Sequence, residues 1–175
     1  FASLKPGMTE LEVAGAIKEH FASEGATPSF WIVGSGGNGA FPVDFAGASA
    51  DGSRVFFHTG ESLVEADQDR DDASDVYQRS GGTTTLVSTG PAFQSGHFSA
   101  FLWGVSASGS RAYFTTAEQL VSTDEDAQID VYLRSGSTTT LVSTGPAGGN
   151  GSFASSFAGA SADGSRAFFT TADRL

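Results

Sequence analysis

Short apolar runs separated by polar turns fill most of the chain, and the pattern recurs. The run FAGASADGSRVFF at 45–57 returns as LWGVSASGSRAYF at 102–114 and as FAGASADGSRAFF at 157–169. A second phrase, DVYQRSGGTTTLVSTGP at 75–91, returns as DVYLRSGSTTTLVSTGP at 130–146. Self-similarity at a nearly fixed period predicts a repeat architecture.

Three equivalent glycines set the period. Gly109 follows Gly52 by 57 residues, and Gly164 follows Gly109 by 55 residues. Within the first repeat we predict four strands, at 45–49, 54–59, 75–80 and 83–89. Asp51-Gly52 is a turn signal between the first two strands. A longer acidic loop, anchored by Leu63 or its equivalent Leu120, precedes the third strand.

Four antiparallel strands per repeat are typical of a β-propeller blade. We therefore predict a mainly β fold: a partial β-propeller of about two four-stranded blades and the start of a third, preceded by a short helix–strand segment. The predicted repeats lie at 36–101, 102–157 and, truncated, 158–175. A closed propeller typically needs about four to eight blades, so we interpret the chain as a fragment whose partners include the missing blades. Its exposed end faces would make it marginally stable or self-associating.

The aromatic pairs of the second strands, such as Phe56-Phe57, are expected to be buried between adjacent sheets. Arg54, Arg111 and Arg166 recur just after the turn, which indicates a structural role against a neighbouring loop. Recurring threonines at 83–85 and 138–140 suit a strand with one solvated face, and sugar binding there is the alternative.

The N-terminal part has a helical pattern instead. An apolar face recurs at helical spacing, at Leu11, Ala14, Ile17 and Phe21. Thr9 and Glu12 form a capping box before it, and Gly25 is a plausible helix end. Residues 28–33 read as a short buried strand. We therefore assign residues 1–35 to a separate α/β segment.

The glycines at 34, 36 and 39 match the G-x-G-x-x-G pattern of dinucleotide-binding motifs. That motif requires a helix beginning at its last glycines, and Pro42 disfavours such a helix, so we do not expect nucleotide binding. Residues 36–54 instead align without a gap to residues 148–166. The repeat therefore extends back to Gly36, and we place the domain boundary there.

Composition excludes several classes of partner. The net charge of −11 and the isoelectric point near 4.4 argue against nucleic acid and anionic membrane surfaces. No apolar run approaches the about 20 residues needed to cross a membrane, so membrane insertion is not expected. The chain has no cysteine, which excludes disulfides and thiolate metal sites.

The acidic loops are the best candidate site. Carboxylates at alternate positions of a tight loop can converge on one hard cation such as Ca²⁺, which prefers six to eight oxygen ligands. The candidate metal ligands are Asp67, Asp69, Asp71 and Asp75 in the first repeat and Asp124, Asp126 and Asp130 in the second. The alternative is a solvated loop in which aspartates cap turn amides. Under that alternative, Asp75 and Asp130 have a structural hydrogen-bonding role.

No catalytic set emerges from the sequence, so we expect a protein that is not an enzyme. His20, His58 and His97 do not recur, and Ser49 and Ser106 lack the final glycine of a nucleophile elbow. We expect both tryptophans to lie in the core. Trp103 replaces an alanine of the other repeats, and exposure of its side chain is the alternative.

Two resemblances follow from these motifs. The phrases SADGSRAFFTTADRL, DVYLRSG and TTTLVSTGP resemble TolB-like, WD-type propeller repeats of bacterial envelope proteins. This resemblance implies an extracytoplasmic, non-catalytic module that binds a protein or a glycan.

LKPGMTELEVAGAIKEHFASEGATPSFWIVGSGGNGAFP resembles the start of a pita-bread metallopeptidase domain, as in Xaa-Pro aminopeptidase and creatinase relatives. Val43 stands where that family has a functional His, and the residues matching its metal ligands are missing. The second resemblance implies a shared origin of the segment; a metallohydrolase fragment and a calcium-stabilised structural repeat remain alternatives.

Overall fold

The chain forms two compact units, Phe1–Val43 and Asp44–Leu175, in a computed structural model. The structure describes residues 8, 10–23, 43–68, 73–92, 96–146 and 150–174. The strand expected at 28–33, the glycine motif at 34–39 and the boundary expected at Gly36 lie outside the described residues.

The described part of the first unit contains the helix α1, Glu10–Ser23, which confirms the helix expected from the apolar spacing. Thr9 of the expected capping box lies outside the described residues. The hydroxyl of Ser23 donates to the carbonyl of His20 at 2.7 Å within the last turn. Among the described residues, no helix is both long enough and apolar enough to cross a membrane.

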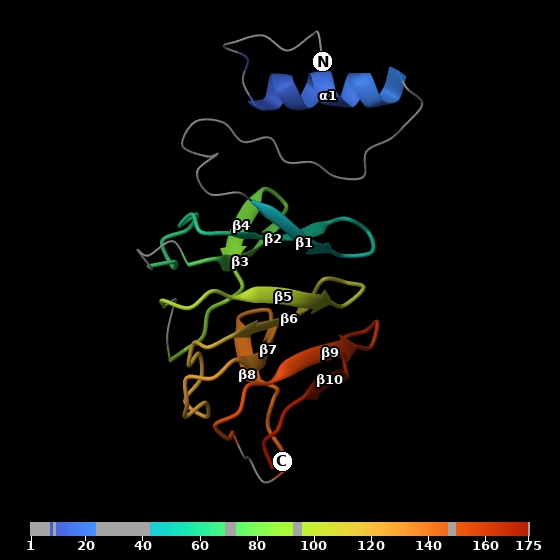
Figure 1. Cartoon of the computed structure of the whole chain (residues 1–175). Helices are drawn as coiled ribbons and strands as arrows, with labels where there is room; N and C mark the ends of the chain where they lie inside the picture. Colours follow the sequence, from blue (N-terminus) through green and yellow to red (C-terminus); the bar gives the residue numbers. More distant parts are fainter. Residues whose placement is uncertain are drawn as a thin grey trace. The chain divides into compact units, whose positions relative to one another are not determined.

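The second unit confirms the mainly β prediction, with ten strands among its described residues in three separate antiparallel sheets. The first sheet contains β1 (Asp44–Ala48), β2 (Arg54–Thr59), β3 (Asp75–Ser80) and β4 (Thr83–Leu86). The second contains β5 (Phe101–Val105), β6 (Arg111–Thr116), β7 (Asp130–Ser135) and β8 (Thr138–Leu141), and the third contains β9 (Ser156–Ala160) and β10 (Ala167–Thr170). Each sheet is a meander in chain order, and β1 contacts β5 as β5 contacts β9 (Figure 1).

Every repeat has a β-bulge in its first strand. Phe45 pairs with Phe57 and Gly47 pairs with Phe56, so Ala46 is the extra residue. The same shift makes Trp103 the extra residue of β5 and Ala158 that of β9. A bulge bends its strand and leaves the extra residue unpaired in the ladder.

The turn after each first strand is built around the predicted Asp-Gly or Ser-Gly pair. Gly52 has φ of 69°, in the left-handed region that favours glycine, and its amide donates to the carbonyl of Ser49 at 3.0 Å. Asp51 accepts hydrogen bonds from Ser49 and from Ser53, which lower the pKa of Asp51 to about 2. Ser49 therefore stabilises the turn.

These turns also join one repeat to the next. The amide of Ala50 donates to the carbonyl of Ala107, and the amide of Ala107 donates to that of Ala162, each at 2.7 Å. Arg111 extends over the following turn and donates to the carbonyl of Gly164 at 2.7 Å. The expected structural role of the recurring arginines against a neighbouring loop is thereby confirmed for Arg111.

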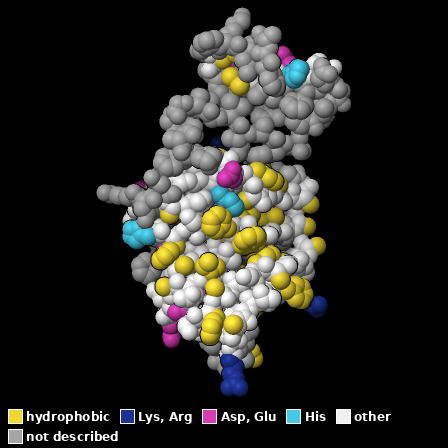
Figure 2. Space-filling model, in the orientation of Figure 1, with side chains coloured by type: hydrophobic (Ala, Val, Ile, Leu, Met, Phe, Trp, Pro, Cys, Tyr) yellow, Lys and Arg dark blue, Asp and Glu magenta, His cyan; other side chains and the backbone are white. Residues whose placement is uncertain are grey.

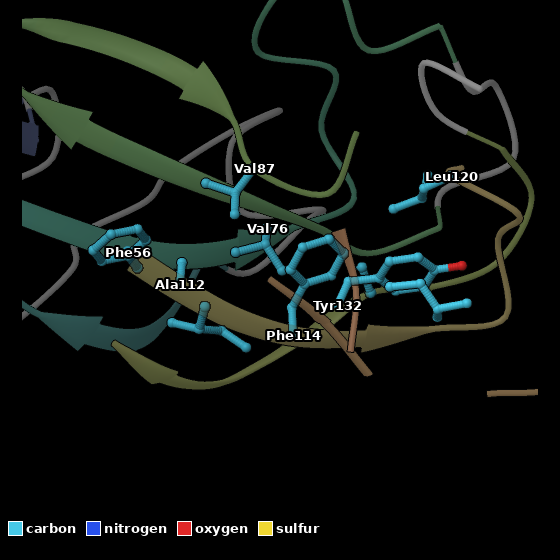
Figure 3. Close-up of a cluster of buried hydrophobic side chains, with 10 residues drawn as sticks. Phe56, Val76, Val87, Ala112, Phe114, Leu120 and Tyr132 are labelled. Carbon is cyan, nitrogen blue, oxygen red and sulfur yellow. The ribbon is translucent and has the colours of Figure 1, made fainter. Parts of the chain in front are cut away.

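The main hydrophobic core lies between the first and second sheets (Figure 3). Phe56 from β2 and Phe114 from β6 are both fully buried there, together with Leu120 from the loop that follows β6. Leu120 is covered because the amide of Ala92, in the link from the first sheet, donates to its carbonyl at 3.1 Å. Its equivalent Leu63 is exposed, so only Leu120 anchors its acidic loop.

Two details differ from the sequence expectations. The fourth strand ends at Leu86 instead of residue 89, because the hydroxyl of Ser88 accepts from the amide of Val76 and replaces a ladder hydrogen bond. The expected burial of both aromatic residues holds in the second repeat, where Tyr113 and Phe114 are buried. In the first repeat Phe56 is buried and Phe57 only partly buried, and in the third neither residue is buried. Phe168 is 61% exposed, whereas its equivalents Phe56 and Tyr113 are each covered by a following sheet.

Candidate functional site

The candidate site of the second repeat lies in the loop between β6 and β7. Asp124 and Asp130 are almost completely buried, and Asp126 is partly buried between them. One carboxylate oxygen from each of the three residues lies within 4.8 Å of the corresponding oxygens of the other two. The structure therefore brings together all three aspartates predicted from the second repeat.

A tyrosine of β7 fixes the start of this loop. The fully buried Tyr132 donates its hydroxyl hydrogen to a carboxylate oxygen of Asp124, and the hydroxyl oxygen lies 2.8 Å from the carbonyl oxygen of Glu118. Burial first, and then the neighbouring Asp124 carboxylate, raise the pKa of Tyr132 well above its usual range. The hydroxyl therefore stays protonated and holds Asp124 in place.

Asp130 is held from the opposite side of the loop. Its Oδ1 accepts from the hydroxyl of Ser143 at 2.5 Å, and that hydroxyl accepts from the amide of Val131 at 3.0 Å. Among the described residues, its buried Oδ2 has no hydrogen-bond partner. The pKa of Asp130 is raised to about 6, chiefly by burial and also by the charges of Asp124 and Asp126, against the lowering effect of the Ser143 hydrogen bond.

An unpartnered carboxylate oxygen in an acidic cluster is costly, because no protein donor compensates for its desolvation. A bound cation would remove both the desolvation cost and the repulsion among the three carboxylates. The amide nitrogen of Asn150 lies 3.0 Å from Asp124 Oδ1 and 3.5 Å from Asp126 Oδ2. Rotation of that amide by half a turn would present its oxygen as a fourth ligand.

The first repeat reproduces the frame of this site. Tyr77 donates to Asp67, its hydroxyl oxygen lies 2.9 Å from the carbonyl oxygen of Glu61, and the hydroxyl of Ser88 donates to Asp75 at 2.5 Å. These are the equivalents of the contacts made by Tyr132 and Ser143. The hydrogen-bonding role considered for Asp75 and Asp130 is therefore observed in both repeats.

Asp69 and Asp71, the other two candidate ligands of the first repeat, lie outside the described residues. The structure thus places Asp67 and Asp75 in the frame and leaves the first-repeat cluster as a sequence prediction.

Sequence reasoning did not identify the tyrosine or the asparagine of this site. The recurrence of Val-Tyr directly after Asp75 and Asp130 was the available signal for the tyrosine. Asn150 gave no comparable signal, because it comes from the link that follows β8 and reaches the loop only through the fold.

The recurring threonines are used inside the sheet. Arg79 donates to the hydroxyl of Thr84 at 2.7 Å, and Arg134 donates to that of Thr139 at 2.8 Å. Thr139 also donates to the carbonyl of Thr89 in the preceding repeat. The middle threonine of each row therefore has a structural partner, which weakens the case for a sugar-binding surface on this strand.

Trp103 does not lie in the core. Its side chain is 60% exposed, and its indole nitrogen donates to the hydroxyl of Thr115 at 2.8 Å. The alternative considered for Trp103, exposure at a position where the other repeats have alanine, is the correct one. Exposed Phe101, buried Leu102 and exposed Trp103 alternate along β5, so the indole lies on the side of the strand away from the core. Comparisons with protein-family models, with curated proteins and with solved structures find no match to this chain.

Proposed function

We propose that the three sheets are consecutive blades of a β-propeller, and that the chain is a non-catalytic repeat module of a bacterial extracytoplasmic protein that binds a protein or a glycan. The repeated junction carries this proposal. The hydrogen bonds from Ala50 to Ala107 and from Ala107 to Ala162 have the same length and connect equivalent atoms. Each four-stranded meander thus meets the next through its first strand and turn, as the blades of a propeller do.

A binding role follows from how the residues are used. The recurring polar side chains of the turns and loops are occupied by structural hydrogen bonds, as Ser49, Tyr77 and Arg111 illustrate. Three exposed large side chains, Phe101, Trp103 and Ile129, differ in type from their equivalents in the other repeats. Propellers present such non-repeating residues on a rigid scaffold, where exposed apolar groups mark interaction sites.

The fold component is tested by chain extension. Further copies of residues 102–157 are added to the end of the chain, and fluorophores on the first and last repeats report the distance between them. A propeller predicts that energy transfer first falls and then rises again as the added blades close the ring. A distance that increases with every copy would indicate an open stack and contradict the proposal.

The binding component is tested with the purified chain on an oligosaccharide array and against a display library of secreted bacterial proteins. Saturable binding to a member of either class is expected, and it should be lost when the chain is unfolded by urea. Absence of saturable binding to both classes at millimolar concentration would contradict a binding function.

A second candidate function, a calcium-stabilised structural repeat, is favoured by the unpartnered Oδ2 of Asp130. Millimolar Ca²⁺ should raise the melting temperature of the chain by several degrees. Asp126→Ala should abolish the increase, whereas Glu125→Ala should retain it, because Glu125 is exposed in the same loop and lies outside the cluster. A melting temperature unaffected by Ca²⁺ would eliminate this candidate.

A further inference from the structure

A cavity of about 260 Å³ opens at the junction of the second and third sheets, beside Trp103. It lies between β5, β6 and the start of β9. The residues that line it are Phe101, Trp103, Thr115, Ile129, Ser155, Ser156 and Phe157. All of these lining residues are uncharged, and they combine aromatic and aliphatic walls with three hydroxyl groups. Hydrophobic side chains also reach the surface elsewhere on the stacked sheets (Figure 2).

The preceding junction shows what is unusual about this one. Where the second junction has Thr115, the first has His58, whose Nε2 accepts from the amide of Leu102 at 2.8 Å. The His58 ring also contacts the ring of Phe101 edge-on, with centroids 5.8 Å apart. An imidazole therefore occupies the space beside the first junction. The smaller Thr115 leaves the equivalent space open.

Within the part of the chain that the structure describes, one hydroxyl of the cavity lining has no hydrogen-bond partner. The amide of Ser155 donates to the carbonyl of Ile129 at 2.7 Å, as the amide of Ala100 donates to that of Ser74 at the first junction. The backbone position is thus the same in both places, but an alanine has become a serine. The side chain of Ser155 is 2% exposed and its Oγ makes no hydrogen bond. A buried hydroxyl without a partner destabilises a fold, so a ligand that satisfies it would explain its presence.

The entrance to the cavity has a fixed aromatic ring. The hydrogen bond from the Trp103 indole to Thr115 restrains the ring, and the side chain remains mostly exposed. Tyr113 stacks on Phe157 with centroids 5.5 Å apart and supports the inner wall. The aromatic surface is therefore already in place before a ligand arrives, which reduces the entropy lost on binding.

We propose that this cavity binds a neutral sugar unit of a glycan, a proposal that rests on the binding function proposed above. A sugar ring has apolar C–H faces that suit the aromatic walls and hydroxyl groups that suit Ser155, Ser156 and Thr115. Phosphate and carboxylate ligands are disfavoured because the lining supplies no cation to pair with them. The cavity is smaller than the about 300–1,000 Å³ of sites for drug-sized ligands, which favours one terminal unit over an extended chain.

The test begins with the full chain on an array of neutral and acidic oligosaccharides. Each neutral oligosaccharide that binds is then titrated while tryptophan fluorescence is recorded in a Trp31→Phe background, which leaves Trp103 as the only tryptophan. Binding should change the Trp103 emission. Trp103→Ala should weaken binding by about tenfold or more, measured by calorimetry. Phe98→Ala is the matched control, because Phe98 is also exposed and lies outside the cavity lining.

Two further variants separate binding from folding. Thr115→His places at the second junction the side chain that occupies the first, and it should abolish glycan binding while the chain stays folded. Ser155→Ala restores the residue of the first junction, so it should weaken glycan binding and leave the melting temperature equal or higher. Reduced stability with unchanged affinity would show that the Ser155 hydroxyl is structural and overturn its role.

The outcomes distinguish the sugar site from the general binding function. Glycan binding that survives Trp103→Ala and Thr115→His would overturn this site and retain the proposed function at another surface. A Trp103 response to aromatic peptides with no neutral oligosaccharide bound would overturn the sugar assignment and favour a protein partner. Failure of the chain to bind either class would overturn both.

Discussion

Gly109→Ala should destabilise the chain much more than the same change at the equivalent glycine of the first repeat. Both glycines have left-handed φ values, 65° at Gly109 and 69° at Gly52. A Cβ added at Gly109 would lie 2.7 Å from Cδ of Arg54 and 3.0 Å from Cβ of Ser49, whereas one added at Gly52 has no heavy atom within 4 Å. Gly52→Ala therefore measures backbone strain alone. The additional destabilisation caused by Gly109→Ala measures how tightly the two repeats pack at the junction.

The expected sizes follow from these two contributions. A non-glycine residue in the left-handed region costs about 1–2 kcal/mol. Forcing extra atoms into a packed contact typically costs about 1–3 kcal/mol more. Gly52→Ala should therefore lower the free energy of unfolding by about 1–2 kcal/mol and Gly109→Ala by about 2–5 kcal/mol. At about 2–4 °C per kcal/mol for a chain of this size, the variants should melt several degrees apart.

Urea unfolding of the full chain, followed by far-ultraviolet circular dichroism, measures both changes. Gly164→Ala is a second test of a junction glycine, with its Cβ 3.0 Å from Cβ of Ser106 and 3.1 Å from Arg111. Adding Arg54→Ala to Gly109→Ala should recover part of the loss, because it removes the closest contact. Equal losses for Gly109→Ala and Gly52→Ala would refute the interlocked junction.

Three other changes test the site and the exposed end face. Tyr132→Phe removes the hydroxyl that holds Asp124, so urea unfolding should show a loss of about 1–3 kcal/mol; unchanged stability would mean that this hydroxyl is unimportant. The pKa of Asp130 is about 6 in the folded chain and about 4 in the unfolded chain. The protonated carboxyl therefore stabilises the fold fully below pH 4, and this stabilisation, up to about 3 kcal/mol, is lost as the pH rises through 6. In urea melts with chelator, Asp130→Asn should flatten this loss between pH 4 and 7, and an unaltered pH profile would assign it to other groups. Phe168 is exposed, whereas its equivalents are covered by the next sheet. Light scattering should therefore show self-association that rises with concentration and is weaker in Phe168→Ser. A monomeric mass at all concentrations would contradict self-association through this end face.

The strands and turns could be predicted because each repeat supplies an independent copy of the same pattern. The second strand is predicted at 54–59 and is found there, and the same agreement holds for the third strand at 75–80. The Asp51-Gly52 turn was equally accessible, because glycine next to aspartate specifies a backbone conformation locally. These features depend on neighbours in the sequence, so the sequence contains the information needed to predict them.

The features that escaped prediction depend on contacts between repeats. Leu63 and Leu120 have the same local sequence pattern, yet only Leu120 is buried, because Gly90 and Ala92 of the preceding link cover it. The exposure of Trp103 likewise depends on which side of β5 the neighbouring sheets cover, because Leu102 beside it is buried. Asn150 approaches the acidic cluster only because the link after β8 returns to the loop before β7.

Comparison of equivalent positions in the two junctions separates structural residues from candidate functional ones better than burial does. Tyr77 and Tyr132 are both fully buried, recur, and make the same contacts, so their burial reports the fold. Ser155 is equally buried, but its equivalent in the first junction is Ala100, which has no side-chain hydroxyl to satisfy. A buried hydroxyl that the scaffold does without elsewhere cannot be explained by the scaffold. The replacement of His58 by Thr115 opens space beside that same hydroxyl, so two departures from the repeat meet at one cavity, as expected for a binding site that developed on a structural repeat.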